Sequence, residues 1–273
     1  GQGAVGQRRE GVRAVSAIEA PDLGTQFIHV EVRGRTLFLT VDRPEKRNAF
    51  RQEMYRALKR AAIWADRQPE LDSVCLTGVD QWFAAGGDMS GGSEDPEGLA
   101  TEWDPTDNFP FRHIERCRKI WVAAVNGVCH AGGIDLALHC DVVLASDRAR
   151  FRVPELLRGI PDPFMSARLV EAVGIVKAKY LFFVADEIDA ATAERMGLVA
   201  VVVPHDELGA EVERVLERIS QTGPVARAQT KADMVNRLPR ADLAVFERAM
   251  TSPEMREGMA AFVQKRPVEW PRG

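Results

Sequence analysis

The stretch Phe83-Ala84-Ala85-Gly86-Gly87-Asp88 comes shortly after an apolar, strand-like run at residues 73–78. A second small-residue turn, Ala131-Gly132-Gly133-Ile134-Asp135, comes shortly after another such run at residues 121–126. Because glycine has no Cβ, each turn can expose backbone N–H groups and let a ligand come close. Two such turns could aim two N–H donors at one oxygen, an arrangement called an oxyanion hole that suits acyl chemistry.

Further motifs flank these turns in a defined order. They are DRPEKRNA at residues 42–49, Cys140-Asp141, PELLRG at residues 154–159 and EGMAAFVQKRP at residues 257–267. Together with the glycine turns, this series resembles the enoyl-CoA hydratase/isomerase family, also called the crotonase superfamily, from about Phe27 to Trp270. The resemblance implies an α/β fold in which a spiral of repeated ββα units is followed by a helical C-terminal region.

Composition narrows the classes of partner. The chain has 273 residues, 45% of them hydrophobic, and a net charge of −4, which gives no footprint for nucleic acid. No apolar run approaches the roughly 20 residues that span a bilayer, so we expect no membrane contact. The four cysteines form no CxxC pair, and most lie in apolar runs. This pattern predicts buried free thiols, a cytoplasmic protein and no metal site.

Three segments are expected along the chain. Residues 1–24 read as a flexible N-terminal extension, residues 25–204 as the ββα core with the acyl-CoA site, and residues 205–273 as a helical region for oligomerisation. The hexapeptide GQGAVG at residues 1–6 matches GxGxxG. No strand precedes it, so we do not interpret it as a dinucleotide site.

Hydrophobic periodicity predicts the individual elements. Residues 27–32 and 36–42 read as a hairpin, and Asn48 is expected to cap a helix whose apolar face includes Met54 and Leu58. Residues 90–110 read as a long irregular loop. Further strands are expected at residues 73–78, from Trp121, at residues 141–145 and at residues 198–203. Further helices are expected from Gly132 and at residues 163–173, 176–184, 189–196, 206–220, 224–237 and 240–264.

Carried over residue by residue, the resemblance makes the N–H groups of Gly87 and Gly132 the donors of the oxyanion hole. It places Asp135 and Glu155 where hydratases of the family carry catalytic glutamates. The two carboxyls could share a water molecule, one acting as base and the other, protonated, as acid. Read without the resemblance, the glycines only form turns, Asp135 complements a helix dipole and Glu155 is a surface acid.

The loop after Gly159 departs from the family pattern. It carries less glycine than typical hydratases and contains Asp162. In the dienoyl-CoA isomerase branch, an aspartate in this loop joins an Asp and a Glu at the two earlier positions, so Asp135, Glu155 and Asp162 could form that catalytic trio. The alternative is that Asp162 is a turn residue of an Asp-Pro pair.

The resemblance also implies contacts with the CoA moiety. They involve the turn around residues 45–47, the backbone near the first glycine turn, and C-terminal positions that reach the nucleotide of a neighbouring subunit in a trimer or hexamer. The residues concerned are Lys46, Arg47, Ala85, Asp88, Phe262 and Lys265.

The resemblance implies hydration of a 2-enoyl-CoA thioester through an enolate that the oxyanion hole stabilises. Coenzyme A is part of the substrate, and no metal or redox cofactor is expected. Double-bond isomerisation of an enoyl- or dienoyl-CoA is the first alternative, favoured by the three carboxylates. A non-catalytic acyl-CoA-binding protein is the second, favoured by the altered loop after Gly159.

Overall fold

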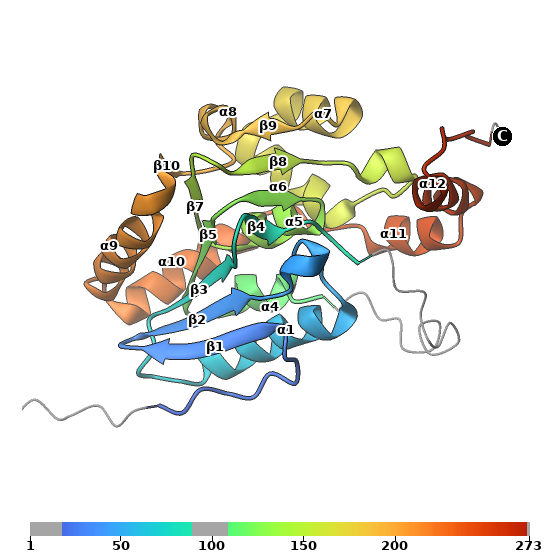
Figure 1. Cartoon of the computed structure of the whole chain (residues 1–273). Helices are drawn as coiled ribbons and strands as arrows, with labels where there is room; N and C mark the ends of the chain where they lie inside the picture. Colours follow the sequence, from blue (N-terminus) through green and yellow to red (C-terminus); the bar gives the residue numbers. More distant parts are fainter. Residues whose placement is uncertain (1–17, 89–108, 272–273) are drawn as a thin grey trace, which may run out of the picture.

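The computed structural model describes residues 18–88 and 109–271. Its main sheet has six strands in the order β1-β2-β3-β5-β7-β10 (Figure 1). The strands are β1 (Ile28–Arg33), β2 (Thr36–Val41), β3 (Ser73–Gly78), β5 (Ile120–Val125), β7 (Val142–Ser146) and β10 (Val201–Val203). The β1–β2 pair is the predicted antiparallel hairpin, and every other pairing in this sheet is parallel.

The central strands are buried on both faces, which explains their nearly continuous apolar sequences. Because side chains alternate across a strand, Leu37 and Leu39 of β2 point to one face and Phe38 to the other. The leucines belong to the large core under helix α1 (Gln52–Asp66). Phe38 packs in a smaller cluster with residues of helix α9 (Leu208–Ser220). Helix α9, in the predicted C-terminal region, therefore packs directly on the core sheet.

A second, shorter sheet runs beside the first. It contains β4 (Trp82–Ala84), β6 (Val128–His130), β8 (Arg150–Arg152) and β9 (Ile188–Asp189) in that order. Each of β4, β6 and β8 follows a strand of the main sheet, and the order β4-β6-β8 repeats the order β3-β5-β7. The chain thus advances by one strand in both sheets at each turn, which confirms the predicted ββα spiral.

The remaining helices cover the ends and outer faces of the sheets (Figure 1). They are α4 (Phe111–Arg116), α5 (Gly132–His139), α6 (Pro163–Val173), α7 (Ile175–Val184), α8 (Ala190–Met196), α10 (Pro224–Asn236), α11 (Leu243–Met250) and α12 (Pro253–Gln264), with short 3₁₀ turns η1 (Pro44–Lys46), η2 (Glu155–Arg158) and η3 (His205–Glu207). Most of the helices confirm the predicted ranges to within a few residues.

The single helix predicted over residues 240–264 is wrong. Helix α11 ends at Met250 and α12 begins at Pro253, with Ser252 between them. The hydroxyl of Ser252 accepts a hydrogen bond from the Met255 N–H at 3.1 Å. Serine before Pro at the first helical position is a strong start signal, so α12 begins as a new helix there.

Asn48 does not cap α1, contrary to the sequence expectation. The residue before α1 is Arg51, and Asn48 lies fully buried in the left-handed region at φ 54°. Its side-chain oxygen accepts from the Arg43 N–H at 2.8 Å, and its amide donates to the carbonyls of Val41 and Trp82. A buried amide that meets three backbone groups joins the end of β2 to the start of β4.

The C-terminal end of the predicted flexible extension, residues 1–24, packs against the core. Leu23 is buried in the core, and its carbonyl accepts a hydrogen bond from Arg60 at 2.7 Å. Most of the predicted extension and of the predicted loop at 90–110 lies outside the described residues.

All four cysteines are buried free thiols, as predicted. Among the helices of residues 18–88 and 109–271, none is long and apolar enough to cross a membrane.

Candidate active site

The two glycine turns lie against each other, although 45 residues separate Gly87 from Gly132 in the sequence. A Cβ added to Gly86 would stand 2.5 Å from the Cβ of Ala131 and 3.4 Å from the Gly132 nitrogen. A Cβ added to Gly132 would stand 3.8 Å from the Gly87 nitrogen. Glycine at both positions therefore permits this close approach.

The amides of Gly87 and Gly132 are free in the described part of the chain. The Phe50 N–H donates to the Gly86 carbonyl at 2.8 Å, and the Asp88 N–H donates to the Phe50 carbonyl at 2.8 Å. These two hydrogen bonds hold the first turn in place. The Gly87 N–H, which lies between them, makes no hydrogen bond to a described residue, and neither does the Gly132 N–H. A backbone N–H without a protein partner is a donor available to a ligand.

A buried ion pair supports the first turn. Arg43 donates to the Asp88 carboxylate at 2.7 Å and to the Ala49 carbonyl at 2.9 Å. Both charged side chains are at most 10% exposed. The Asp88 carboxylate, predicted to contact CoA, thus pairs with Arg43 and holds the glycine turn; its contact with CoA stays a prediction.

The second turn opens α5. Ala131 adopts φ 53° and its N–H donates to the Arg152 carbonyl at 3.0 Å, which ties the turn to β8. Gly132 is the first helical residue, so its N–H belongs to the unsatisfied donors of the helix N-terminus. The positive end of the helix dipole favours negative charge at this place.

Asp135, Glu155 and Asp162 come together from three different elements. Asp135 lies in the first turn of α5, Glu155 begins η2, and Asp162 caps α6 by accepting from the Met165 N–H at 2.9 Å. Asp162 lies close enough to Asp135 to raise the pKa of the Asp135 carboxyl. Asp162 is thus both the turn residue and a member of the carboxyl cluster.

Burial is the main cause of the electrostatic state of this cluster. It raises the pKa of Asp135 well above its usual value, and the neighbouring Asp162 raises it further. Burial, followed by the charge of Asp162, raises the pKa of Glu155 to about 8. Asp135 Oδ1 and Glu155 Oε2 are buried without a partner in the described chain. A carboxyl whose pKa lies near neutrality can both donate and accept a proton during a reaction.

Tyr55 is a site residue that the sequence did not single out. It lies on α1, and its ring centroid is 5.0 Å from that of Phe50 and 5.2 Å from that of Phe109. Its hydroxyl oxygen is 2.5 Å from the point where a Cβ of Gly132 would be. The available signal was that Tyr55 adjoins the apolar face of α1, where a buried hydroxyl needs a partner.

Comparison with known proteins identifies the family of this chain. The family model for enoyl-CoA hydratase/isomerase matches residues 33–273. The chain belongs to this family. It is 35% identical over 256 residues to a probable enoyl-CoA hydratase of Rhizobium meliloti, covering 88% of this chain and 96% of that protein. It is 32% identical over 248 residues to a crotonyl-CoA hydratase of Syntrophomonas wolfei, covering 88% and 95%.

Solved structures of family members show the same architecture. The crystal structure of an enoyl-CoA hydratase/isomerase from Pseudoalteromonas atlantica superposes with a TM-score of 0.78 at 30% identity. The match covers 90% of this chain and all of that one. The crotonase-like fold expected from the sequence is thereby confirmed.

The residues expected to contact CoA in this family member fall into two groups. Lys46 and Arg47 are exposed beside the first glycine turn, where the Ala85 N–H donates to the Arg47 carbonyl at 3.2 Å. Phe262 lies on α12, and the Arg158 guanidinium of the same chain is 4.4 Å from its ring centroid. Lys265 is exposed at the end of α12. The structure thus joins Arg47 with Ala85, and it places Phe262 against the turn that carries Glu155.

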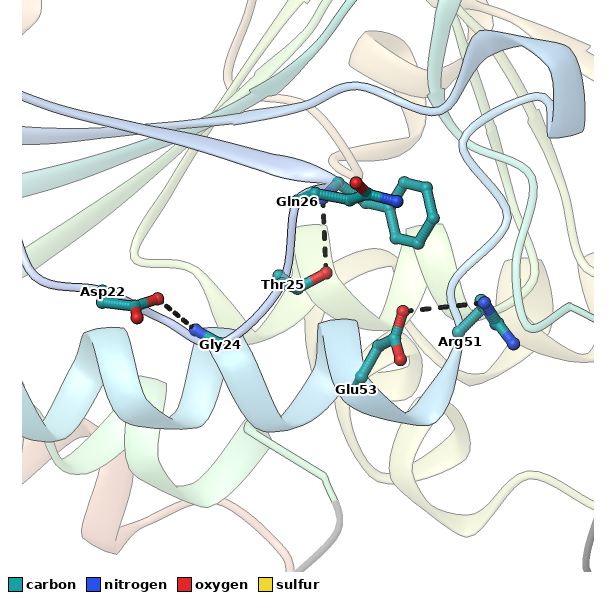
Figure 2. Close-up of a pocket in the computed structure, with 7 residues that line it drawn as sticks. Asp22, Gly24, Thr25, Gln26, Arg51 and Glu53 are labelled. Atoms are coloured by element: carbon teal, nitrogen blue, oxygen red, sulfur yellow. Dashed lines mark hydrogen bonds and ion pairs between the residues drawn. The ribbon is translucent and has the colours of Figure 1, made fainter.

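A shallow hollow lies elsewhere on the surface, at the start of α1 (Figure 2). Its rim includes an ion pair of 3.7 Å between Arg51 and Glu53 and a turn in which the Gly24 N–H donates to Asp22. None of the predicted site residues lines it, so it is separate from the candidate active site.

Proposed function

We propose that the protein adds water across the 2,3 double bond of 2-enoyl-CoA thioesters to form 3-hydroxyacyl-CoA. The observation that carries this proposal is the pair of free amides on adjoining turns, Gly87 and Gly132, close to a cluster of buried carboxyls. The relatives named as enoyl-CoA and crotonyl-CoA hydratases support it.

The proposed reaction assigns a role to each group. The oxygen of water bonds to C3 as Asp135, in its ionised form, accepts a proton from that water; the burial that raises the pKa of Asp135 makes this ionised form a stronger base. Negative charge moves onto the thioester oxygen, where the amides of Gly87 and Gly132 stabilise it. Protonated Glu155 then delivers a proton to C2, consistent with a pKa of about 8 that keeps the acid protonated at neutral pH. The proposal requires no metal or redox cofactor, since CoA is part of the substrate.

The proposal is tested with crotonyl-CoA and the purified protein. We expect loss of the enoyl-thioester absorbance and a product heavier by one water molecule in mass spectrometry. Binding of enoyl-CoA thioesters without conversion of any chain length would refute hydration and support the non-catalytic alternative.

Asp162→Asn tests the role of the third carboxyl. Asparagine can keep the hydrogen bond that caps the helix, and its amide can donate to Asp135. Because asparagine is uncharged, it removes the negative charge that raises the pKa of Asp135. We expect hydration to remain within about tenfold of the wild type. We also expect the lower pH limit of kcat/KM to move to lower pH, because Asp135 deprotonates more readily. The measurement is a pH–rate profile of crotonyl-CoA hydration for both proteins.

A second candidate function is isomerisation of a 3,5-dienoyl-CoA, favoured by the position of Asp162, which is close enough to raise the pKa values of both Asp135 and Glu155. A parent protein that isomerises the dienoyl-CoA but does not hydrate crotonyl-CoA, and that loses isomerisation in Asp162→Asn, would replace hydration by this activity.

We infer that the protein assembles into a trimer or hexamer in the cytoplasm. The exposed apolar side chains of α7 support assembly, with Val176 78% and Phe183 70% exposed in the single chain. The buried free thiols support a reducing compartment. Sedimentation is expected to give a multiple of three times 30.2 kDa. A monomer at micromolar concentration would contradict the assembly.

A further inference from the structure

We propose that the hydroxyl of Tyr55 is a third hydrogen-bond donor to the thioester oxygen, beside the amides of Gly87 and Gly132. This inference rests on the proposed function, because it concerns the same developing oxyanion. It assigns a catalytic contact to helix α1, outside both glycine turns.

The hydroxyl of Tyr55 occupies the space between the two turns. A Cβ atom added to Gly132 would lie 2.5 Å from the Tyr55 hydroxyl oxygen and 3.8 Å from the Gly87 nitrogen. Three donors from α1, the first turn and the second turn therefore border one small region. Donors held in place before the reaction stabilise a developing charge without the cost of reorganisation.

The ring of Tyr55 is held tightly. The residue is 6% exposed, and its ring packs against the rings of Phe50, Phe109 and Phe111. It also stands on a helix of 15 residues whose inner face is buried in the core. The aromatic neighbours fix the ring, so the position of the hydroxyl is a property of the fold.

The hydroxyl makes no hydrogen bond to any group within residues 18–88 and 109–271. The hydroxyl oxygen is not one of the fully buried unpartnered polar atoms, so it is open to a ligand. The Tyr55 hydroxyl lies beside the amides of Gly87 and Gly132, and none of the three donors has a partner in the described chain. We therefore infer that all three can bind the same acceptor.

The surroundings keep Tyr55 protonated. Burial raises its pKa first, and the charges of Asp135, Asp162 and Glu155 raise it further. These three carboxyls are the titratable groups that face it from α5, α6 and η2. A phenol held in its neutral form serves as a hydrogen-bond donor rather than as a base.

The test compares Tyr55→Phe with wild type, and Tyr180→Phe serves as the matched control. The chain has two tyrosines, and Tyr180 on α7 is 47% exposed. We expect Tyr55→Phe to lower kcat for crotonyl-CoA hydration by about 10- to 100-fold with KM within about threefold. Tyr180→Phe should match the wild type.

A second measurement does not depend on turnover. Acetoacetyl-CoA forms an enolate that absorbs in the near ultraviolet, so its ionisation on the protein can be followed directly. We expect the bound probe to ionise at higher pH in Tyr55→Phe than in the wild type, because the enolate loses one donor. Saturated butyryl-CoA, which forms no oxyanion, should bind both proteins with equal affinity.

A third measurement keeps the hydroxyl in place. Fluorotyrosine incorporated into Tyr180→Phe labels Tyr55 alone, and its fluorine resonance should move on binding acetoacetyl-CoA. An unmoved resonance would overturn the proposal even if Tyr55→Phe failed to fold.

The outcomes separate this inference from the proposed function. Wild-type hydration together with unchanged kcat and unchanged enolate ionisation in Tyr55→Phe would overturn the role of Tyr55 alone. Easier ionisation of the probe in Tyr55→Phe would also overturn it, since the hydroxyl would then obstruct the hole. Absence of hydration in the wild type, with the expected shift in enolate ionisation, would remove the proposed function and leave Tyr55 as an oxyanion donor.

Discussion

Glu155→Gln is expected to lower kcat for crotonyl-CoA hydration by about 10²-fold or more. Glutamine preserves the shape of the side chain but cannot deliver a proton to C2. Glu155 is 6% exposed and has a pKa of about 8, so it is protonated at the pH of the assay. Steady-state kinetics at neutral pH give kcat and KM, and we expect KM to change far less than kcat.

Glu171→Gln is the control, because Glu171 is an exposed residue of α6 remote from the carboxyl cluster. Thermal unfolding should show that Glu155→Gln is folded. Its stability relative to wild type should increase as the pH rises from about 4.5 to about 8 and then level off, because over this range the unfolded wild type has lost the proton that folded Glu155 keeps. Wild-type turnover in Glu155→Gln would rule out the proposed mechanism.

Gly132→Ala is the second variant with a large expected effect. Its Cβ would meet the Tyr55 hydroxyl at 2.5 Å, which is far inside normal contact. Either the Tyr55 side chain or the start of α5 must move, which displaces the hydroxyl or the Gly132 amide from its position beside Gly87. We expect kcat to fall by about 10²-fold or more, as for loss of an oxyanion-hole donor, together with a lower melting temperature.

The double variant Gly132→Ala/Tyr55→Phe tests the cause of this effect. After the hydroxyl, the nearest atoms to the added Cβ are 3.8 Å away, so removal of the hydroxyl should restore most of the melting temperature. Gly209→Ala on α9 is the control, because no atom lies within 4 Å of its added Cβ. Equal destabilisation of the single and double variants would show that the hydroxyl is not the obstacle.

The local patterns of the sequence are sufficient for much of this fold. Alternating and apolar runs predict the β1–β2 hairpin and the buried strands, because side-chain periodicity directly reflects which faces meet the core. Helix starts that are marked by neighbouring residues in the sequence were also predicted correctly, as with Gly132 at the start of α5. Prediction was weaker where two signals competed, since the periodicity over residues 240–264 concealed the new start at Ser252 and Pro253.

The candidate site divides in the same way. The glycine turns and the carboxyls Asp135, Glu155 and Asp162 were predictable from the amino-acid sequence, because their residue types and order carry the family resemblance. It also predicted that two turns could serve one oxygen. The structure now shows that Gly86 and Gly132 lie within contact distance of each other.

The contacts between residues far apart in the sequence were not predictable and became visible only in the folded chain. They include the ion pair of Asp88 with Arg43, the closeness of Asp162 to Asp135, the hydrogen bonds by which Asn48 joins β2 to β4, and the approach of the Tyr55 hydroxyl to Gly132. Such contacts join residues on different elements, so no local periodicity or cap signal records them. They depend on how the sheets and α1 pack, which is the sum of many weak apolar contacts over the whole core.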